Sequence, residues 1–198
     1  MTRVLAFSDL HHSRTKAEDL VAAAAEADLV IGAGDFCNMR SDLPGAMTLL
    51  AGIRAPMVLV PGNAESAEEL SDAAPAGATV LHGGTAEQAG LKLAGLGYAV
   101  PRTPFGDWSC DLDEAEAAAL LTGVDAADVL ISHSPPKGVG DRTSAGQSVG
   151  STAVRDWIER VQPRLAVCGH VHDSWGVRGR IGATEVVNLG PTPNWFDL

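Results

Sequence analysis

The chain has 198 residues, 45% of them hydrophobic and 5% aromatic, and a formal net charge of −11 at pH 7. This length suits one domain, and the negative charge disfavours proteins that bind a nucleic acid duplex or an anionic membrane. The three cysteines form no C-x-x-C pair, which disfavours a disulfide framework. No apolar run approaches the ~18 residues of a membrane span, and the start Met1–Phe7 is too short for a signal peptide. We therefore expect a cytoplasmic protein without a membrane segment.

Short apolar runs between turn residues predict β-strands along the whole chain. They span Arg3–Phe7, Leu29–Ile31, Met57–Val60, Thr79–Leu81, Leu91–Leu96, Val129–Ile131, Leu165–Cys168, Trp175–Arg178 and Glu185–Asn188. Apolar residues at helical spacing predict helices over Lys16–Glu26, Leu112–Leu121 and Ser151–Val161. Strands alternate with helices in the first half, which favours parallel pairing, whereas glycine-rich turns near the C-terminus favour antiparallel pairing. We expect an α/β fold in which two mixed sheets pack face to face between flanking helices.

Polar residues follow each of the first three predicted strands within a few positions. Asp9 and His11 come after the first strand, and residues two apart in an extended chain point the same way, so both can share a cation. Asp35 follows the second strand and a Gly-Ala-Gly turn, and Asn63 follows the third strand and Pro-Gly. Each of these residues alone also fits an ordinary turn.

Histidines follow two of the later strands. His133 comes after Val129–Ile131, where a lone histidine is more often structural, but His170 and His172 flank a single valine after Leu165–Cys168. Two imidazoles at this spacing suit metal binding. Four of the six histidines lie in these motifs. Because such polar groups are costly to bury at strand ends unless something pairs them, their succession predicts a site for two adjacent divalent cations.

In order and spacing, these motifs resemble the signature of the calcineurin-like metallophosphoesterase superfamily. That signature reads D-x-H, G-D-x-x-[DN], G-N-H-[DE], a later His, and G-H-x-H, and the resemblance extends from Asp9 to His172. The stretches His133–Gly138 and Val187–Pro191 resemble the small uncapped phosphoesterases of the Icc-related group. The resemblance implies a four-layer αββα fold, formed as one domain over residues 1–198 without a cap domain.

The resemblance also implies a reaction and a set of metal ligands. We expect hydrolysis of a small-molecule phosphate ester by a hydroxide that bridges two metals, without a nucleophilic Ser or Cys. Mn²⁺ is the expected metal, while Fe, Ni or Zn also suits these donors. By resemblance, Asp35 bridges the metals and Asn63 lies near the phosphate, so both are counted as catalytic. The implied ligands are Asp9, His11 and His172 for one metal, Asn63, His133 and His170 for the other, and Asp35 for both.

The chain departs from the signature at Ala64, where the family has a histidine that often protonates the leaving oxygen. A general acid contributes roughly 10²–10⁴-fold, so esters with poor leaving groups should suffer most from its loss. We therefore expect activated or cyclic phosphodiesters to be preferred over alkyl monoesters. His12 is a candidate replacement for the acid, although an exposed or supporting histidine fits it as well. Candidate phosphate-binding cations, which also fit solvated surface charges, are Arg14, Lys137 and Arg142.

Three alternatives stay open at this point. The first is a catalytically weak protein that uses the fold as a binding or regulatory scaffold, which would normally show eroded ligand positions. The second is a nuclease, which should carry a basic track for the nucleic acid backbone. The third is a protein Ser/Thr phosphatase, which relies on the histidine that Ala64 replaces and on a longer chain. The oligomeric state also stays open.

Overall fold

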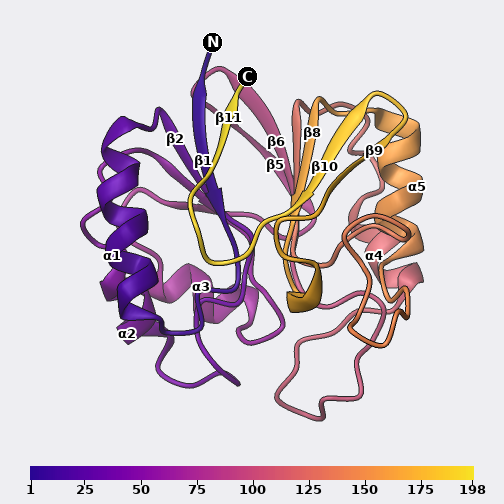
Figure 1. The fold of residues 1–198 in the computed structure, drawn as a ribbon, viewed down its shortest axis with the longest axis horizontal. Coiled ribbons are helices and arrows are strands. Elements are labelled where there is room, and N and C mark those ends of the chain that lie inside the picture. Colours follow the sequence, from indigo (N-terminus) through magenta and orange to yellow (C-terminus); the bar gives the residue numbers. More distant parts are fainter.

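The computed structural model describes all 198 residues and contains two β-sheets that pack against each other (Figure 1). The first sheet has the strand order β11-β1-β2-β3-β4 and the second the order β5-β6-β7-β8-β10-β9. The first contains β1 (Arg3–Phe7), β2 (Leu29–Gly32), β3 (Met57–Leu59), β4 (Thr79–Val80) and β11 (Asn194–Asp197). The second contains β5 (Gly84–Gln88), β6 (Leu91–Leu96), β7 (Val129–Ser132), β8 (Leu165–Cys168), β9 (Arg178–Ile181) and β10 (Thr184–Asn188). Neighbours from β1 to β4 and from β6 to β8 are parallel, as are β8 and β10, whereas the outer pairs β1–β11, β5–β6 and β9–β10 are antiparallel.

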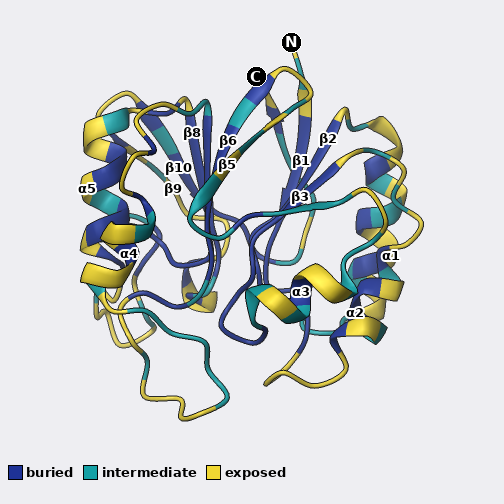
Figure 2. Ribbon diagram, turned by 180° about the vertical axis from the view of Figure 1, so that it is seen from behind, coloured by how far each residue is buried: buried dark blue, intermediate teal, exposed yellow.

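Helices cover the outer face of each sheet, as the two opposite views show (Figures 1 and 2). The first sheet is covered by α1 (Arg14–Ala23), α2 (Leu43–Leu49) and α3 (Ala67–Ala73), and the second by α4 (Glu114–Leu120) and α5 (Thr152–Val161). Two short 3-10 helices lie at Ala24–Glu26, after α1, and at His172–Ser174, between β8 and β9. None of the helices combines the length and the apolar character that crossing a membrane requires.

Alternation of side chains along the strands builds a core in three layers. In β1, Val4 and Ala6 face the second sheet, whereas Leu5 and Phe7 face the helices on the outside. In β7, Ile131 belongs to the layer between the sheets, while Leu130 packs beneath α4 and α5. Central strands buried on both faces must be apolar at every position, which is why they are visible in the sequence as unbroken apolar runs.

The predicted α/β fold with two mixed sheets and flanking helices is confirmed. The strand predicted at Trp175–Arg178 is wrong, since β9 begins only at Arg178 and Trp175 lies in a turn that points its indole at Asp9. Helices α2 and α3 and strands β5 and β11 were not predicted individually. Trp195 and Phe196 form part of β11 and pack on opposite faces of the first sheet.

Candidate metal centre

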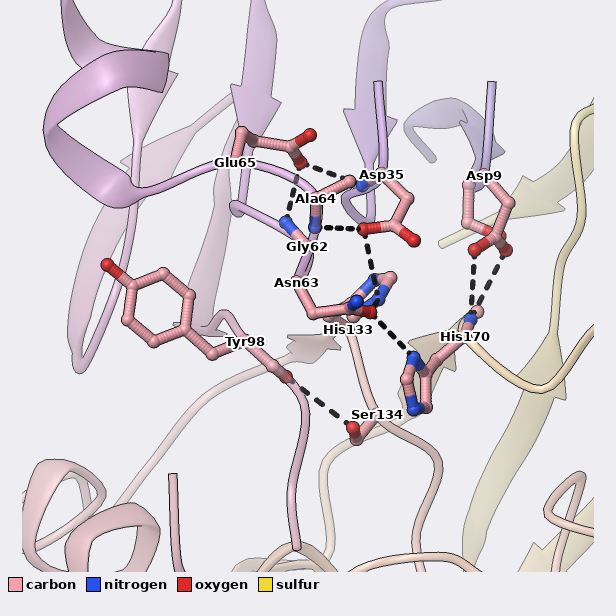
Figure 3. A network of polar contacts seen from close by, with 12 residues as sticks. Asp9, Asp35, Gly62, Asn63, Ala64, Glu65, Tyr98, His133, Ser134 and His170 are labelled. Carbon is pink, nitrogen blue, oxygen red and sulfur yellow. Dashed lines mark hydrogen bonds and ion pairs between the residues drawn. The ribbon is translucent and has the colours of Figure 1, made fainter. Parts of the chain in front are cut away.

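The loops that follow five parallel strands meet at one edge of the two sheets (Figure 3). From the first sheet, β1 leads to Asp9 and His11, β2 to Asp35 and β3 to Asn63. From the second sheet, β7 ends one residue before His133, and β8 is followed by the loop with both later histidines. Carboxyl ends of parallel strands share an edge, so residues far apart in sequence come together there.

Several of these residues adopt a left-handed backbone conformation that side chains other than glycine rarely take. The φ angles are 55° at Asp9, 45° at His11, 57° at Asp35 and 66° at His170. Hydrogen bonds between the loops hold them there: Asp9 N donates to Gly34 O at 2.9 Å, and His170 N donates to the Asp9 carboxylate at 3.1 Å. Such strain is typical of sites whose surroundings over-determine the backbone.

One group of possible ligands consists of Asp9, His11 and His172, whose donor atoms lie within 4.8 Å of one another. Asp9 Oδ1 lies 3.6 Å from His172 Nε2, and the Nε2 atoms of the two histidines are 3.2 Å apart. His11 Nδ1 donates to the Cys37 carbonyl at 3.1 Å, which directs Nε2 toward the other donor atoms, where it could bind a metal. Three donors thus converge on one point.

A second group lies beside the first and is linked to it by Asp35. Asp35 Oδ1 lies 3.4 Å from His133 Nε2, and Asp35 Oδ2 lies 3.6 Å from His11 Nε2, so the Asp35 carboxylate faces both groups. Asn63 Oδ1 lies 3.1 Å from His133 Nε2 and 2.9 Å from His170 Nδ1. The Asn63 amide nitrogen donates to Ser109 Oγ, and this bond directs the amide oxygen toward the histidines.

The charges in this cluster are unbalanced. Asp9 and Asp35 are only 1% and 5% exposed, and their ion-pair partners are histidines rather than Lys or Arg. Burial opposes ionisation of Asp9, but its contacts with His172, His133 and Ser8 prevail and hold its pKa well below the usual range. Burial, together with the nearby His133, lowers the pKa of His170 to about 4, so that ring is neutral at pH 7. Two buried carboxylates, the neutral imidazole of His170 and the Asn63 amide oxygen fit divalent cations well.

A family model described as calcineurin-like phosphoesterase matches residues 2–174 of the chain. The chain belongs to the calcineurin-like phosphoesterase family. Among curated relatives, the UPF0046 protein T07D4.2 of Caenorhabditis elegans is 40% identical over 106 residues, which cover 50% of this chain but only 26% of the worm protein. Family membership therefore rests on the match to the family model and not on this relative, of which the chain covers only a part.

Solved structures share the fold of this calcineurin-like phosphoesterase at low identity. The protein TT1561 of Thermus thermophilus is 17% identical with a TM-score of 0.77, over 99% of this chain and 98% of that protein. A dimetal phosphatase from Danio rerio is 13% identical with a TM-score of 0.66, over 96% and 88% of the two chains. At this identity, the likeness establishes the architecture.

Sequence reasoning missed Glu65 as a residue that supports the site of this phosphoesterase. The Glu65 carboxylate is fully buried and accepts hydrogen bonds from the backbone N–H groups of Gly62 and Asp35 at 2.7 and 2.8 Å (Figure 3). It also accepts from the N–H groups of Phe36 and Cys37 at 3.1 and 3.4 Å. Burial, and next the charge of Asp35, raise its pKa to about 7. Glu65 thus joins the Asp35 loop to the Asn63 loop. The acidic position of the G-N-H-[DE] signature is the signal that could have identified it.

Of the other predicted site residues, only Lys137 lies beside the cluster of possible metal ligands. Lys137 lines a cavity of about 600 Å³ that also touches His170 and His172. Arg142 does not line it, and its guanidinium donates to Gly146 O, while Arg14 lies exposed at the start of α1. His12 Nε2 donates to the Ser41 carbonyl at 2.9 Å and takes no part in the cluster of ligands.

Trp175 contacts the centre directly and was also missed. Its indole N–H donates to Asp9 Oδ2 at 3.0 Å, and its ring lies over His172 with centroids 4.4 Å apart. An indole in this position orients the Asp9 carboxylate and shields the His172 ring.

Trp175 should therefore report metal binding by its fluorescence. We expect Co²⁺ to quench the emission of the wild-type protein and the Trp175→Phe variant to lose most of that quench, because Trp175 touches two predicted ligands. A Trp195→Phe variant, altered on the edge strand β11, should keep it. Equal quenching in all three proteins would show that cobalt binds elsewhere.

Proposed function

We propose that this protein is a dinuclear metal-dependent phosphodiesterase. The supporting observation is the convergence of seven donor residues from both sheets, among them two buried carboxylates that lack Lys or Arg partners. Family membership agrees with a phosphate ester as substrate, and the fold shared with a dimetal phosphatase agrees with two metals.

The proposed roles follow the two groups of ligands. Asp35 faces both groups and is proposed to bridge the cations. When bound, the pair of cations, proposed to be Mn²⁺, supplies an activated water and neutralises charge on the phosphate. The proposed ligands are Asp9, His11 and His172 for one metal, and Asn63, His133 and His170 for the other.

The preference for diesters is argued from Ala64. Its side chain is buried in the apolar layer beneath the helices, and Arg40 N and Cys37 Sγ donate to its carbonyl, so the Cys37–Ser41 loop covers it. His12 Nε2 is already hydrogen bonded to the Ser41 carbonyl, and His12 belongs to neither group of clustered donors. Neither residue offers a proton to a leaving group, and hydrolysis should depend on how readily that group leaves unaided.

This proposal predicts a steep dependence on the leaving group. With added Mn²⁺, bis-p-nitrophenyl phosphate should be hydrolysed at least about 10²-fold faster than an alkyl monoester such as glycerol phosphate, because no side chain assists the departing alkoxide. The measurement is kcat/KM across esters of phenols of graded acidity, together with cyclic nucleotides. If kcat/KM does not change with the acidity of the phenol, a side chain that we have not identified protonates the leaving group. Full metal occupancy without hydrolysis of any ester would instead favour the scaffold.

A further inference from the structure

The cavity beside the metal centre has a chemically mixed lining. One stretch of the lining contains Phe105 with Pro101 and Pro104, and another contains Lys137 with hydroxyl-bearing residues such as Thr143 and Ser148. Arg102, Glu114 and Asp173 add charges of both signs. His170 and His172 also line the cavity, so it opens directly onto the proposed ligands. About 600 Å³ is enough for one organic group of moderate size.

The apolar stretch of the lining belongs to the long loop between β6 and α4, which extends beyond the sheets at the bottom of Figure 1. Within this loop, Asp111 accepts hydrogen bonds from Thr103 N and Oγ1 and from Ser109 Oγ, at 2.6 to 2.8 Å. The same Ser109 hydroxyl accepts from Asn63, and Cys110 N donates to the Asn63 carbonyl. The loop is thus fastened to a proposed ligand and holds a defined position.

Phe105 is presented to the cavity as an aromatic platform. Trp108 packs against the apolar layer of the first sheet and stacks parallel to Phe105, with an interplanar angle of 1° and centroids 5.9 Å apart. The Phe105 ring also lies 6.3 Å from that of His170, and 51% of the residue is exposed. A supported aromatic ring with a free surface beside a polar centre suits stacking by another ring.

We infer that Phe105 determines specificity by stacking on a planar aromatic group of the phosphate ester. The inference rests on the proposed function, because it places the ester's phosphate at the ligands and its organic group in the cavity. The polar part of the same lining suits polar substituents on that ring. Lys137 Nζ donates to the Ser148 carbonyl at 2.6 Å and forms no ion pair, so further N–H bonds are available to a ligand.

The test compares two phosphonates that cannot be hydrolysed. Phenylphosphonate and methylphosphonate are titrated calorimetrically into the Mn²⁺-loaded protein, and the ratio of their Kd values isolates the contribution of the ring. We expect phenylphosphonate to bind roughly fivefold more tightly, which is the scale of an aromatic contact. Phe105→Ala should bring the ratio close to one, Phe105→Tyr should preserve it, and Phe105→Leu should lose most of it.

A ratio of one in the wild-type protein, or an equal ratio in Phe105→Ala, would overturn the inference. Assays of bis-p-nitrophenyl phosphate on the same preparations separate it from the proposed function. Hydrolysis without a ring preference would leave the phosphodiesterase standing and remove the aromatic subsite. A ring preference that depends on Phe105, without any hydrolysis, would support the subsite and reject the phosphodiesterase.

Discussion

Replacing Glu65 with alanine is expected to lower the free energy of unfolding by about 3 kcal/mol, because four buried backbone N–H groups lose their acceptor. The cost stays below the sum of four lost bonds, since the variant also removes a carboxylate that is unfavourably buried. The loops of Asp35 and Asn63 should separate, and metal affinity should fall as well. Urea unfolding of the metal-free protein measures the first effect, and metal analysis measures the second.

Glu68→Ala provides the matched control for Glu65→Ala. Glu68 lies three residues further along, exposed in the first turn of α3, and its replacement should change stability by no more than about 0.5 kcal/mol. If the two variants unfold at the same urea concentration, the Glu65 carboxylate does not hold these loops together.

Replacing Asp35 with asparagine is expected to have the largest effect on activity. Asparagine is nearly the same size and its oxygen can still accept the hydrogen bond from Ala64 N, which Asp35 Oδ1 accepts at 2.8 Å. The variant loses one of two buried negative charges that face the histidines. Hydrolysis should fall by more than the roughly 10²-fold that loss of a supporting partner costs, because Asp35 itself faces both proposed metals.

Thermal unfolding provides a second measurement that does not depend on turnover. Mn²⁺ at 100 times its Kd stabilises a protein by about 2.7 kcal/mol, so the wild-type melting temperature should rise on addition of metal. That rise should shrink strongly in Asp35→Asn and persist in Asp156→Asn, whose carboxylate lies exposed on α5. An undiminished rise in Asp35→Asn would remove Asp35 from the proposed metal centre.

The parts of the fold that were predicted correctly are those with strong local signals. β1, β6 and β8 have the predicted bounds because strands buried on both faces consist mostly of apolar residues. β9 has no such composition, since its sequence Arg-Gly-Arg-Ile lies at a sheet edge with one buried residue. Helix α3 has only seven residues, although the Ser66–Glu69 capping box that begins it was visible in the sequence.

The candidate site was predictable to the extent that each residue is marked by its own short motif. Asp9, His11 and the later histidines follow strands, and the order of their motifs resembles a family signature. Ser109 and Trp175 have no such marker, because they act through contacts with residues 46 and 166 positions away. Long-range contacts of this kind arise only when the chain has folded.

The division of the donor residues between two sheets has a mechanical consequence. The spacing between the two halves of the centre is determined by how the facing sheets pack, through side chains such as Ile31, Val58 and Ile131. Since packed interiors transmit small displacements, enlarging or trimming one of these side chains would shift one set of donors against the other. Catalytic rate could then be tuned from the interior of the protein, by residues that never meet the substrate.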